Sequence, residues 1–454
     1  MPPKNALPPG NEARLQINPP DKLDDHTVVL ITGANTGLGY SDCCRLIDEF
    51  AQNFSAKHKL TIIFTTRRPP AKVTETRNGL LKYASRHGNP VASRITVLAE
   101  TLDLCDLWSV RALSRRLNRN FPKLDAIILN AGAGGWLGLN WPKTLYNVFT
   151  DFVHALTWPN FKLGSVGVTV PRHTNLPEET PLGLVFCGNV FGHYMLAHNL
   201  MPLLRRSGRP NGPGRVIWTG SIEATINFFD VEDIQALKRD VAYESSKTLT
   251  DLLALTSDLP STAPWVNSYL ADDSQPSSKS TTATELVNSP APIIYVSHPG
   301  IFGSSVVPLI LPLWYCMLAA MYIARFIGSP WHTVSTYLGA IAPVWLALSP
   351  QEVLDEAEKP YRENGGGYVK WGSSTDRLGN PLVACTEIDG WGFGGVIGTG
   401  VLPEDRARRR KRGMKYTTAE DRVRFEELGR RSWQQMEELR VHWEKLLDAA
   451  EESE

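Results

Sequence analysis

Short apolar runs alternate with longer amphipathic stretches from residue 26 to about residue 300. The first run, 26–32, is rich in β-branched residues and leads into a glycine-rich segment, 33–39. Further strands are predicted at 60–66, 94–98, 125–129, 215–219 and 292–297, and helices at about 40–56, 71–87, 107–120, 185–206 and 240–257. Near-continuous apolar strands that alternate with helices are typical of a parallel sheet covered on both faces. The pattern therefore predicts an α/β fold with a doubly wound parallel sheet.

Two segments inside this region lack a clean period and are predicted to be insertions. Residues 134–184 are rich in Trp, Pro and Gly, and residues 258–290 are rich in Ser, Thr and Pro, which favours a solvated loop. Residues 1–25 contain many prolines and lack the apolar stretch of a secretory signal, so we expect a mobile tail. The main domain is therefore expected to span residues 26–300.

An uncharged run follows the main domain, from residue 301 to residue 324. A helix of this length could cross roughly 30 Å of hydrocarbon, but Pro308 and Pro312 interrupt the run. A second apolar stretch covers residues 334–348. Two interpretations of the region 301–350 stay open: it associates with a membrane, on the surface or as one span, or its helices form core and substrate pocket.

Residues 351–454 are predicted to form a polar extension. A basic run at 406–412 fits a solvated segment, an attraction to anionic lipid headgroups or a nuclear signal. After it, apolar residues recur at helical spacing: Phe425, Leu428, Met436, Leu439, Trp443 and Leu446. This stripe predicts a final amphipathic helix that docks on the body of the protein or on a partner.

The composition excludes several functional classes. Lys and Arg number 47 and Asp and Glu number 47, so the formal net charge is +0 and no nucleic-acid partner is expected. Hydrophobic residues make up 42% of the chain and charged residues 21%, as in ordinary globular proteins. The 6 cysteines lack the density and spacing of a disulfide or zinc scaffold, so we expect reduced thiols and no metal site.

The first candidate for chemistry is the glycine-rich turn after the first strand. Thr32, Gly33, Gly37 and Gly39 follow a strand and precede a helix. Glycines at such a turn let the backbone approach a pyrophosphate, which the helix N-terminus attracts. The turn, with Asn35 and Leu38 inside it, is therefore a candidate dinucleotide site, and a plain strand-to-helix turn is the alternative.

A second candidate lies on the predicted helix 240–257. Tyr243 and Lys247 are four residues apart, so they share one helix face. We expect the cation to lower the pKa of the phenol toward working pH, which would ease proton donation to a carbonyl. Ser221 follows the strand 215–219, and its hydroxyl could hold a substrate oxygen.

In their chain order and context these motifs resemble those of the short-chain dehydrogenase/reductase family over about residues 26–300. The resemblance implies a Rossmann-type catalytic domain with Ser221 orienting the substrate, Tyr243 as general acid and Lys247 also holding the nicotinamide ribose. The glycine turn would bind the dinucleotide, and Asp103 would contact its adenine. Capping of the next helix is the alternative role for Asp103.

The same resemblance assigns three further motifs. Asn130, Ala131 and Gly132 would steady the sheet beside the cofactor. Asn189 would support a water molecule of the proton relay. The alternative is that Asn189 is an ordinary amide on a helix face without a role in the reaction. The turn at Pro299 and Gly300 would pass the nicotinamide.

Charge at the end of the second strand bears on the choice of cofactor. The strand ends in Thr65, Thr66, Arg67 and Arg68, without an Asp or Glu to accept a bond from a ribose 2′-hydroxyl. Arg67 could instead pair with a 2′-phosphate. We therefore predict NADPH rather than NADH, with two solvated arginines as the alternative.

Two long spacings narrow the resemblance to one branch. Ser221 and Tyr243 are 22 positions apart, more than is usual in the family, and the insertion separates Asn130 from Asn189. Segments 134–143, 151–155 and 297–302 resemble the branch that reduces 3-keto-steroids in fungal ergosterol synthesis, which is related to the animal 17β-hydroxysteroid dehydrogenase type 7.

This branch implies a substrate and a cellular place. We expect NADPH-dependent reduction of a 3-keto sterol to a 3β-hydroxy sterol during C-4 demethylation. The endoplasmic reticulum membrane or lipid droplets would be the location, with the catalytic domain facing the cytosol and other C-4 demethylation enzymes as partners. Two alternatives stay open. The protein reduces another lipophilic ketone or aldehyde, or it serves mainly as an assembly partner in a membrane complex of sterol enzymes.

Overall fold

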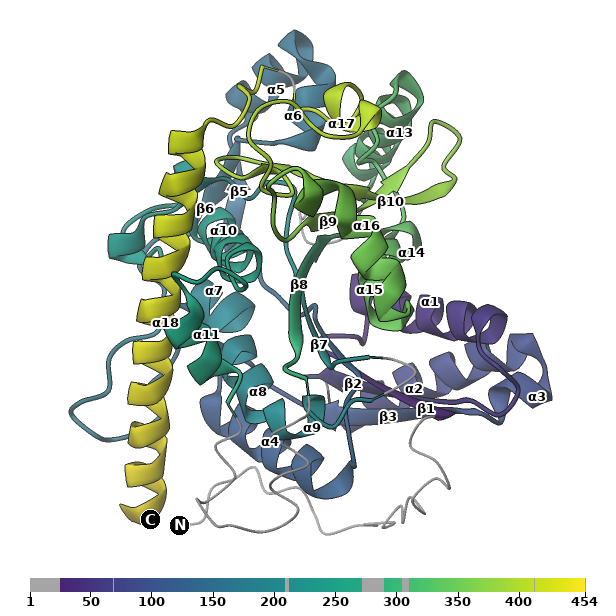
Figure 1. Ribbon diagram of the computed structural model, residues 1–454, viewed down its shortest axis with the longest axis vertical. Coiled ribbons are helices and arrows are strands. Elements are labelled where there is room, and N and C mark those ends of the chain that lie inside the picture. The colour runs from purple at the N-terminus through teal and green to yellow at the C-terminus, as the bar shows by residue number, and fades with distance from the viewer. Residues whose placement is uncertain are drawn as a thin grey trace.

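An eight-stranded sheet forms the centre of the molecule (Figure 1). The computed structural model describes residues 25–67, 69–208, 212–271, 290–303, 310–411 and 413–453. The strand order is β10-β9-β8-β7-β4-β1-β2-β3, and neighbours pair in parallel except for the antiparallel pair of β9 and β10. The predicted doubly wound parallel sheet is confirmed. The predicted tail lies, up to residue 24, outside the described residues.

Up to residue 298 the strands occur close to where the pattern predicts them, whereas the helix predicted at 185–206 is divided into several shorter helices. The sheet comprises β1 (His26–Ile31), β2 (Lys59–Thr66), β3 (Ile95–Thr101), β4 (Ala126–Leu129), β7 (Arg215–Thr219), β8 (Ile293–His298), β9 (Lys370–Thr375) and β10 (Pro381–Cys385). The helices that cover or extend it include α1 (Gly37–Asn53), α2 (Pro70–Ala84), α3 (Asn89–Ala92), α4 (Leu107–Asn120), α7 (Leu184–Phe186), α8 (Gly192–Asn199), α9 (Met201–Leu204), α10 (Ala242–Leu255) and α16 (Gln351–Glu363).

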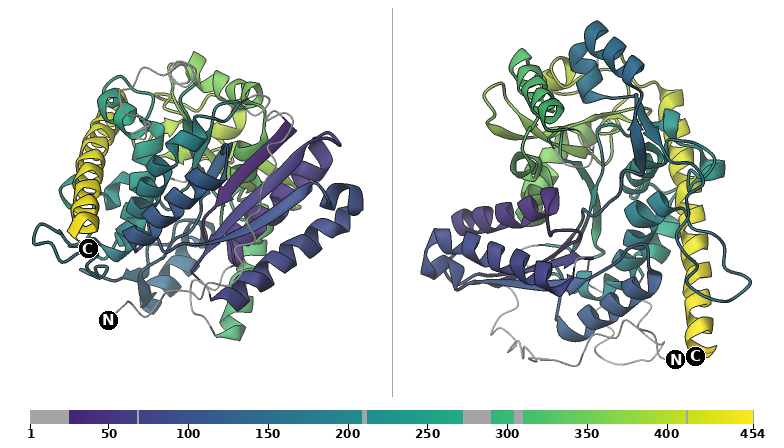
Figure 2. Two further views of the ribbon diagram at one scale, coloured as in Figure 1. Left: turned by 90° about the horizontal axis from the view of Figure 1, so that it is seen from below. Right: turned by 180° about the vertical axis from the view of Figure 1, so that it is seen from behind.

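The sheet is buried on both faces, which explains its uninterrupted apolar strands. One core cluster includes Leu117 of α4, Leu196 of α8 and Leu249 of α10. The other includes Leu46 of α1 and Leu80 of α2. Each cluster lies on its own side of the sheet because side chains alternate between the two faces of a strand. Figure 2 shows helices on both sides.

The insertion 134–184 folds into a small unit of its own. β5 (Trp136–Leu139) and β6 (Lys162–Gly164) pair antiparallel, and α5 (Trp141–Thr150) and α6 (Phe152–Thr157) lie between them in sequence. Each helix begins at a polar cap, since Asn140 accepts a bond from the Lys143 amide and Asp151 accepts one from the His154 amide. These elements are too short for a hydrophobic period to predict them.

The prediction of a solvated loop at 258–290 is wrong for its first part. Residues 263–269 form α11 (Ala263–Tyr269). Pro264 lies in the first turn of this helix, where proline is favoured. Tyr269 is buried and stacks on Tyr194 with ring centroids 4.2 Å apart. This burial outweighs the polar composition of the segment. Residues 272–289 lie outside the described part of the chain.

The region 301–350 divides into an exposed helix and a buried one. α13 (Leu311–Ile327) buries Met321 and Ala324 and exposes many apolar side chains, whereas α15 (Ile341–Leu348) packs under the strands β7 to β10 and belongs to the core. α14 (Thr336–Gly339) connects the two. Within the described residues, no helix combines the length and hydropathy that crossing a bilayer requires. Residues 304–309 are not described.

The part beyond residue 350 is more than a polar extension, because β9 and β10 complete the central sheet. The predicted amphipathic helix is α18 (Ala419–Ser453), which lies along α10 and α11 (Figure 1). Its stripe docks on the body of the protein, with Phe425, Met436 and Trp443 buried.

The basic run lies at the surface, with Arg406 and Arg408 exposed, and several of its side chains bond to the protein. Arg408 donates to the carbonyl oxygens of Gly328 at 2.8 Å and Thr375 at 3.0 Å. Arg409 pairs with Asp405, the third residue of the short helix α17 (Pro403–Arg406), at 2.9 Å. Residue 412 lies outside the described residues.

Candidate active site

Four of the sequence motifs meet at one edge of the sheet. Thr32 follows β1, Asn130 follows β4, Ser221 follows β7 and Pro299 follows β8. Because the carboxyl ends of parallel strands share an edge, these residues lie at one edge of the sheet, around the point between β1 and β4 where the strand order reverses. In open α/β sheets the ligand-binding crevice lies at this point.

The glycine turn is shaped for close approach of the backbone. A Cβ at Gly33 would lie 2.8 Å from the Ala131 Cβ, and a Cβ at Gly39 would lie 2.5 Å from the Asn130 Nδ2. Gly37, at the start of α1, has open space beside it and a φ of 61°. The open space at a helix N-terminus fits the phosphates of a dinucleotide. Asn35 and Leu38 lie in the same turn and are partly buried.

Thr32 fastens the turn to the next motif. Its hydroxyl oxygen accepts bonds from the backbone amides of Asn130 at 2.9 Å and Ala131 at 3.0 Å. The Asn130 side chain donates to the Thr32 carbonyl at 2.9 Å. Asn130 and Ala131 therefore steady the sheet as the resemblance implies.

A buried histidine supports Thr32 from below. His193 Nδ1 lies 3.1 Å from the carbonyl oxygen of Asn189, which can only accept, so Nδ1 carries the proton. His193 Nε2 then accepts from the Thr32 hydroxyl at 2.8 Å. Burial lowers the pKa of His193 to about 3, so the ring is neutral. No motif in the sequence marks this residue.

Asn189 lies in a π-helical turn, Cys187–Phe191, between α7 and α8. Its side chain accepts from the Ala133 amide at 2.7 Å and donates to Ser246 Oγ of α10 at 3.1 Å. A Cβ at Gly132 would lie 3.0 Å from Asn189 Oδ1. The residue is thus more than a helix-face amide, and its support of a relay water stays a prediction.

The structure brings Ser221, Tyr243 and Lys247 together. Tyr243 lies in the first turn of α10, and the side chain of Ser221 acts on its phenol, opposing the rise in its pKa. The Lys247 Nζ lies 5.8 Å from the centre of the Tyr243 ring and donates to the Thr219 carbonyl at 2.7 Å. An acid, an orienting hydroxyl and a cation therefore surround one point at the crevice.

The expected lowering of the Tyr243 pKa is wrong for this structure. Burial raises the pKa of Tyr243, and the negative charge of Glu223 raises it further, while the Ser221 hydrogen bond lowers it. Burial also lowers the pKa of Lys247 to about 8. Burial disfavours the charged form of both groups, which the four-residue spacing cannot indicate. Tyr243 holds its proton at neutral pH, as a general acid must.

Charged and aromatic residues that no motif marks complete the site. The Trp136 ring of β5 lies edge-on to Tyr243 with centroids 4.7 Å apart. The Lys162 Nζ of β6 lies 5.2 Å from the centre of the Tyr243 ring and pairs with Glu223. The insertion thus forms one wall of the site. Its density of tryptophan was the available signal, but nothing in the sequence shows that it folds back onto Tyr243.

Arg67 and Asp103 lie side by side at the cofactor edge. The Arg67 Nη1 is 3.9 Å from Asp103 Oδ1, and the Arg67 side chain is 68% exposed. Asp103 accepts from the Cys105 amide at 2.9 Å, while Asp106 caps α4. The alternative role of Asp103 as the helix cap is therefore wrong.

The turn after β8 is held by the segment that follows α13. Gly300 has a φ of 71°, which favours glycine. Thr333 donates its hydroxyl to the Pro299 carbonyl at 3.0 Å, and the Ile301 amide donates to the Trp331 carbonyl at 2.7 Å. These bonds fix Pro299 and Gly300 beside the crevice.

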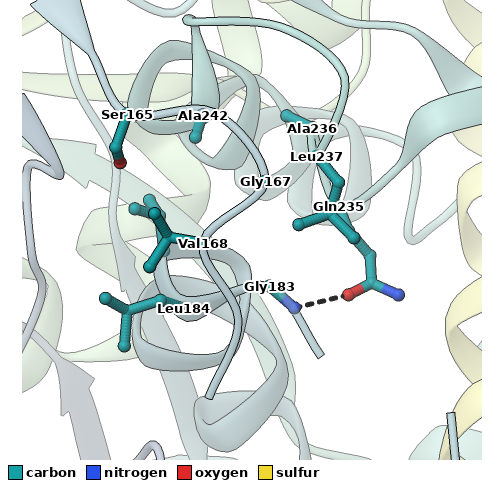
Figure 3. A pocket seen from close by; sticks show the side chains of 10 residues that line it. Ser165, Gly167, Val168, Gly183, Leu184, Gln235, Ala236, Leu237 and Ala242 are labelled. Atoms are coloured by element: carbon teal, nitrogen blue, oxygen red, sulfur yellow. Dashed lines mark hydrogen bonds between the residues drawn. The ribbon is translucent and has the colours of Figure 1, made fainter. Parts of the chain in front are cut away.

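A small pocket lies between the end of the insertion and the segment 235–237 (Figure 3). It is bounded by segments 165–168, 183–185 and 235–237 and reaches Ala242, the residue before Tyr243. The Gly183 amide donates to Gln235 Oε1 at 2.7 Å across it. Its lining does not include Ser221, Tyr243 or Lys247, so it is separate from the reacting groups.

The chain is similar over most of its length to fungal proteins of known name. It is 56% identical to the 3-keto-steroid reductase erg27 of Aspergillus fumigatus over 93% of this chain and 95% of that protein. It is 38% identical to the 3-keto-steroid reductase ERG27 of Gibberella zeae over 92% and 94%. With the protein of the same name from Saccharomyces cerevisiae the identity is 28% over 82% and 92%.

No family model matches the chain. A short-chain dehydrogenase structure from Salmonella enterica serovar Typhi is 17% identical over 72% of this chain and 92% of that chain, with a TM-score of 0.36, which is too low to carry an argument. The strand order, the Ser221, Tyr243 and Lys247 set and the fungal relatives agree: the chain belongs to the 3-keto-steroid reductase family of short-chain dehydrogenases/reductases.

Proposed function

We propose that this protein is an NADPH-dependent 3-ketosteroid reductase, which converts a 3-keto sterol to a 3β-hydroxy sterol in the C-4 demethylation steps of ergosterol synthesis. The observation that carries the proposal is the meeting of Ser221, Tyr243 and Lys247 at the carboxyl edge of the sheet. The name of the Aspergillus fumigatus relative, at 56% identity, supports the substrate class.

The chain's own residues perform the proton chemistry of this reaction. When bound, the nicotinamide supplies the hydride that reduces the C3 carbon. Ser221 orients the carbonyl oxygen with its hydroxyl, and Tyr243 donates the phenolic proton to that oxygen. Lys247 carries a positive charge below about pH 8 and stabilises the phenolate that remains. Trp136 and Lys162 close one side of the site against water.

The choice of NADPH is supported by charge at the end of β2. The exposed guanidinium of Arg67 directly follows β2. The strand ends without a carboxylate that could accept a hydrogen bond from a ribose 2′-hydroxyl. A 2′-phosphate would make a stronger partner for Arg67 than Asp103 does at 3.9 Å. Gly37 leaves space for the pyrophosphate at the start of α1.

A lipid surface, of the endoplasmic reticulum or of a lipid droplet, is the proposed location, with the catalytic domain in the cytosol. α5 and α13 lie at the same end of the molecule, and α6 contacts α13 (Figures 1 and 2). Neither α5 nor α13 contains an acidic residue. Their exposed apolar side chains include Leu145, Tyr146, Phe149, Tyr322, Ile323, Phe326 and Ile327.

This apolar end suits embedding in one leaflet rather than a span. Exposed aromatic and aliphatic side chains on short helices bury well at the boundary of headgroups and acyl chains. Such contact would let a sterol enter the site without crossing water. Other membrane enzymes of C-4 demethylation would meet the protein on the same surface.

Turnover tests the enzymatic proposal. Detergent-solubilised protein should oxidise NADPH with a 4-methyl-3-keto sterol, should act poorly with NADH, and should lose at least about 100-fold in kcat when Tyr243 is changed to Phe. Clear reduction of smaller ketones without turnover of the sterol would remove the sterol assignment and keep the Tyr243 chemistry.

Liposome flotation tests the location. The variant Phe149→Ser/Phe326→Ser should float less than the wild type with vesicles of phosphatidylcholine and phosphatidylinositol. Val423→Ser, at an exposed apolar position on α18 away from this end, is the control and should float as the wild type does. Equal flotation of all three proteins would contradict the proposed surface.

A further inference from the structure

His298, the last residue of β8, has both of its ring nitrogens bonded inside the protein. The Gly300 backbone amide donates to His298 Nδ1, with 3.1 Å between the two nitrogens. Because an amide N–H can only donate, Nδ1 is the unprotonated nitrogen and Nε2 carries the proton. His298 Nε2 therefore donates to Thr386 Oγ1 at 2.8 Å. The ring is buried, and burial together with the charge of Lys370 lowers its pKa, so the ring is neutral.

The packing around His298 fixes the position of its ring. Gly372 lies opposite His298 where β8 pairs with β9, and a Cβ at Gly372 would overlap His298 Nε2. The Trp331 ring packs edge-on to the imidazole, with ring centroids 5.0 Å apart. Thr386 is also held in place, because its amide donates to the carbonyl of Lys370 in β9 at 3.0 Å. The fold thus decides which nitrogen of His298 faces the turn.

The turn formed by Pro299 and Gly300 lies beside the glycine turn. A Cβ at Gly339 would lie 3.1 Å from the Pro299 carbonyl oxygen and 3.3 Å from Leu38 Cδ1. Leu38 belongs to the glycine turn, so the two turns meet at Gly339. The turn after β8 therefore borders the site proposed for the pyrophosphate.

The strand before this turn contacts the loop of the reacting groups. The Gly220 amide donates to the Ser297 carbonyl at 2.7 Å, and Ser221 is the residue after Gly220. A dinucleotide with its phosphates at the glycine turn and its nicotinamide beside Ser221 and Tyr243 would pass between these two contacts. A shift of the turn would therefore move the nicotinamide relative to Tyr243.

We propose that His298, held in one tautomer by Thr386, is a positioning residue that fixes the turn of Pro299 and Gly300 against the nicotinamide. Thr333 holds the carbonyl of Pro299, and His298 holds the amide of Gly300. His298 acts through Gly300 and takes no part in hydride or proton transfer. The inference rests on the proposed function for the bound cofactor.

Two substitutions of His298 separate positioning from the filling of space. In His298→Asn, Oδ1 takes the place of Nδ1 and can accept from the amide two residues ahead, as asparagine does in Asx turns. In His298→Gln the side-chain amide lies one bond further out, in the place of Nε2, and the Gly300 amide loses its acceptor. Both variants remove the ring, so both lose its packing.

Steady-state kinetics with NADPH and the 4-methyl-3-keto sterol give the first readout. In His298→Gln, kcat should fall at least about tenfold, because small misplacements of reacting groups are costly. The slowing caused by deuterium at the transferred position of NADPH should increase, because hydride transfer becomes the slow step. In His298→Asn, kcat should stay within about threefold of the wild type, since the acceptor for Gly300 is kept.

Cofactor binding gives the second readout. The NADPH dissociation constant of His298→Gln, measured by fluorescence titration, should change less than about threefold, because the phosphates are held at the glycine turn. A loss of kcat without a matching loss of affinity is the mark of a misplaced nicotinamide. Equal losses of kcat in His298→Gln and His298→Asn would overturn the proposal, and so would a His298→Gln variant as active as the wild type.

Nitrogen NMR of the protein with isotope-labelled histidine tests the tautomer without cofactor or substrate. The signals that are missing in His298→Asn belong to His298. They should show an unprotonated Nδ1 and a protonated Nε2 at neutral pH. A protonated Nδ1 would overturn the proposal.

A second variant carries the test if His298→Gln does not fold. Thr386→Val removes the acceptor for the Nε2 proton and so releases the ring to the other tautomer, in which Nδ1 no longer accepts from Gly300. Its kcat should fall while its NADPH affinity stays near that of the wild type. An unchanged kcat in Thr386→Val would overturn the proposal.

His58→Gln is the matched control. His58 is buried, and its Nε2 is bonded to the Thr27 hydroxyl at 2.8 Å, as that of His298 is to the hydroxyl of Thr386. His58 directly precedes β2, at the amino ends of the strands and opposite the crevice. His58→Gln should lower the stability of the protein and leave kcat and NADPH affinity unchanged.

The wild type separates failure of this inference from failure of the proposed function. Reduction of smaller ketones without turnover of the sterol would refute the sterol assignment, and the His298 variants are then compared with the smaller ketone. A wild type that binds no NADPH would refute the proposed cofactor and the role of His298 together.

Discussion

The Lys370 ammonium donates a 2.6 Å hydrogen bond to Asp251 Oδ2 inside the protein, where the two side chains are 0% and 1% exposed. The same Nζ donates to the backbone carbonyl of Ser221 at 2.7 Å. Asp251 lies one turn after Lys247 on α10, and Lys370 lies on β9. A strand far along the chain thereby fixes the loop that carries the orienting serine.

Breaking this pair should destabilise the protein strongly. Lys370→Met leaves the Asp251 carboxylate buried without its hydrogen-bonded cation, and we expect a loss of roughly 3 kcal/mol or more in the free energy of unfolding. Urea denaturation followed by circular dichroism measures it. The double variant Lys370→Met/Asp251→Leu should recover part of the loss, because it leaves one fewer buried charge. A cost below about 1 kcal/mol for the single variant would show that the pair is unimportant.

The glycine turn should tolerate no side chain at its third glycine. In Gly39→Ala the new Cβ would lie 2.5 Å from Asn130 Nδ2 and 2.8 Å from the Gly33 carbonyl oxygen, so the turn must shift. We expect NADPH affinity, measured by fluorescence titration, to fall at least about tenfold, the effect of roughly 1.4 kcal/mol. Gly208→Ala, where a Cβ meets nothing within 4 Å, is the control and should bind normally. Unchanged affinity in Gly39→Ala would argue against binding at this turn.

Acid should lower the stability of the folded protein by favouring the protonated form of His193, which only the unfolded chain accommodates well. Its pKa is about 3 in the folded protein and near 6.5 when unfolded, so between these values the unfolded chain binds the extra proton. The stability that the neutral ring contributes is present above about pH 6.5 and is lost as the pH falls toward 3. Relative to His193→Gln, the wild type should lose up to about 1.4 kcal/mol per pH unit in this window, as measured by urea denaturation. Parallel pH curves for the two proteins would contradict the assignment of a neutral buried ring.

The C-terminal helix should contribute to the stability of the catalytic helix. Trp433 of α18 is 1% exposed, and its Nε1 donates to the Leu253 carbonyl of α10 at 3.1 Å. Trp433→Ala should cost about 3–5 kcal/mol, because it opens a large cavity at this contact. Glu438→Ala, on the exposed side of α18, should change the unfolding free energy by less than about 0.5 kcal/mol. Similar thermal denaturation of both variants would show that α18 is only loosely docked.

The sequence by itself determined the six parallel strands from β1 to β8 in the central sheet and the order of the motifs, but not β9 and β10. The strand at 26–31, the glycine turn and the strand at 126–129 are recognisable because buried parallel strands need continuous apolar runs and tight turns need glycine at particular positions. The spacing of Tyr243 and Lys247 also survives folding, because residues four apart on a helix always share a face.

Only the tertiary structure decided how charge is arranged around those motifs. Lys162 and Lys370 reach the site from segments about 80 and 120 residues away from the catalytic pair, distances over which no local period operates. The raised pKa of Tyr243 follows from burial and from Glu223, and burial is a property of the packed molecule. Burial also distinguishes the exposed helix α13 from the core helix α15. Both sequences are apolar, so only the packing around each helix decides which one is buried.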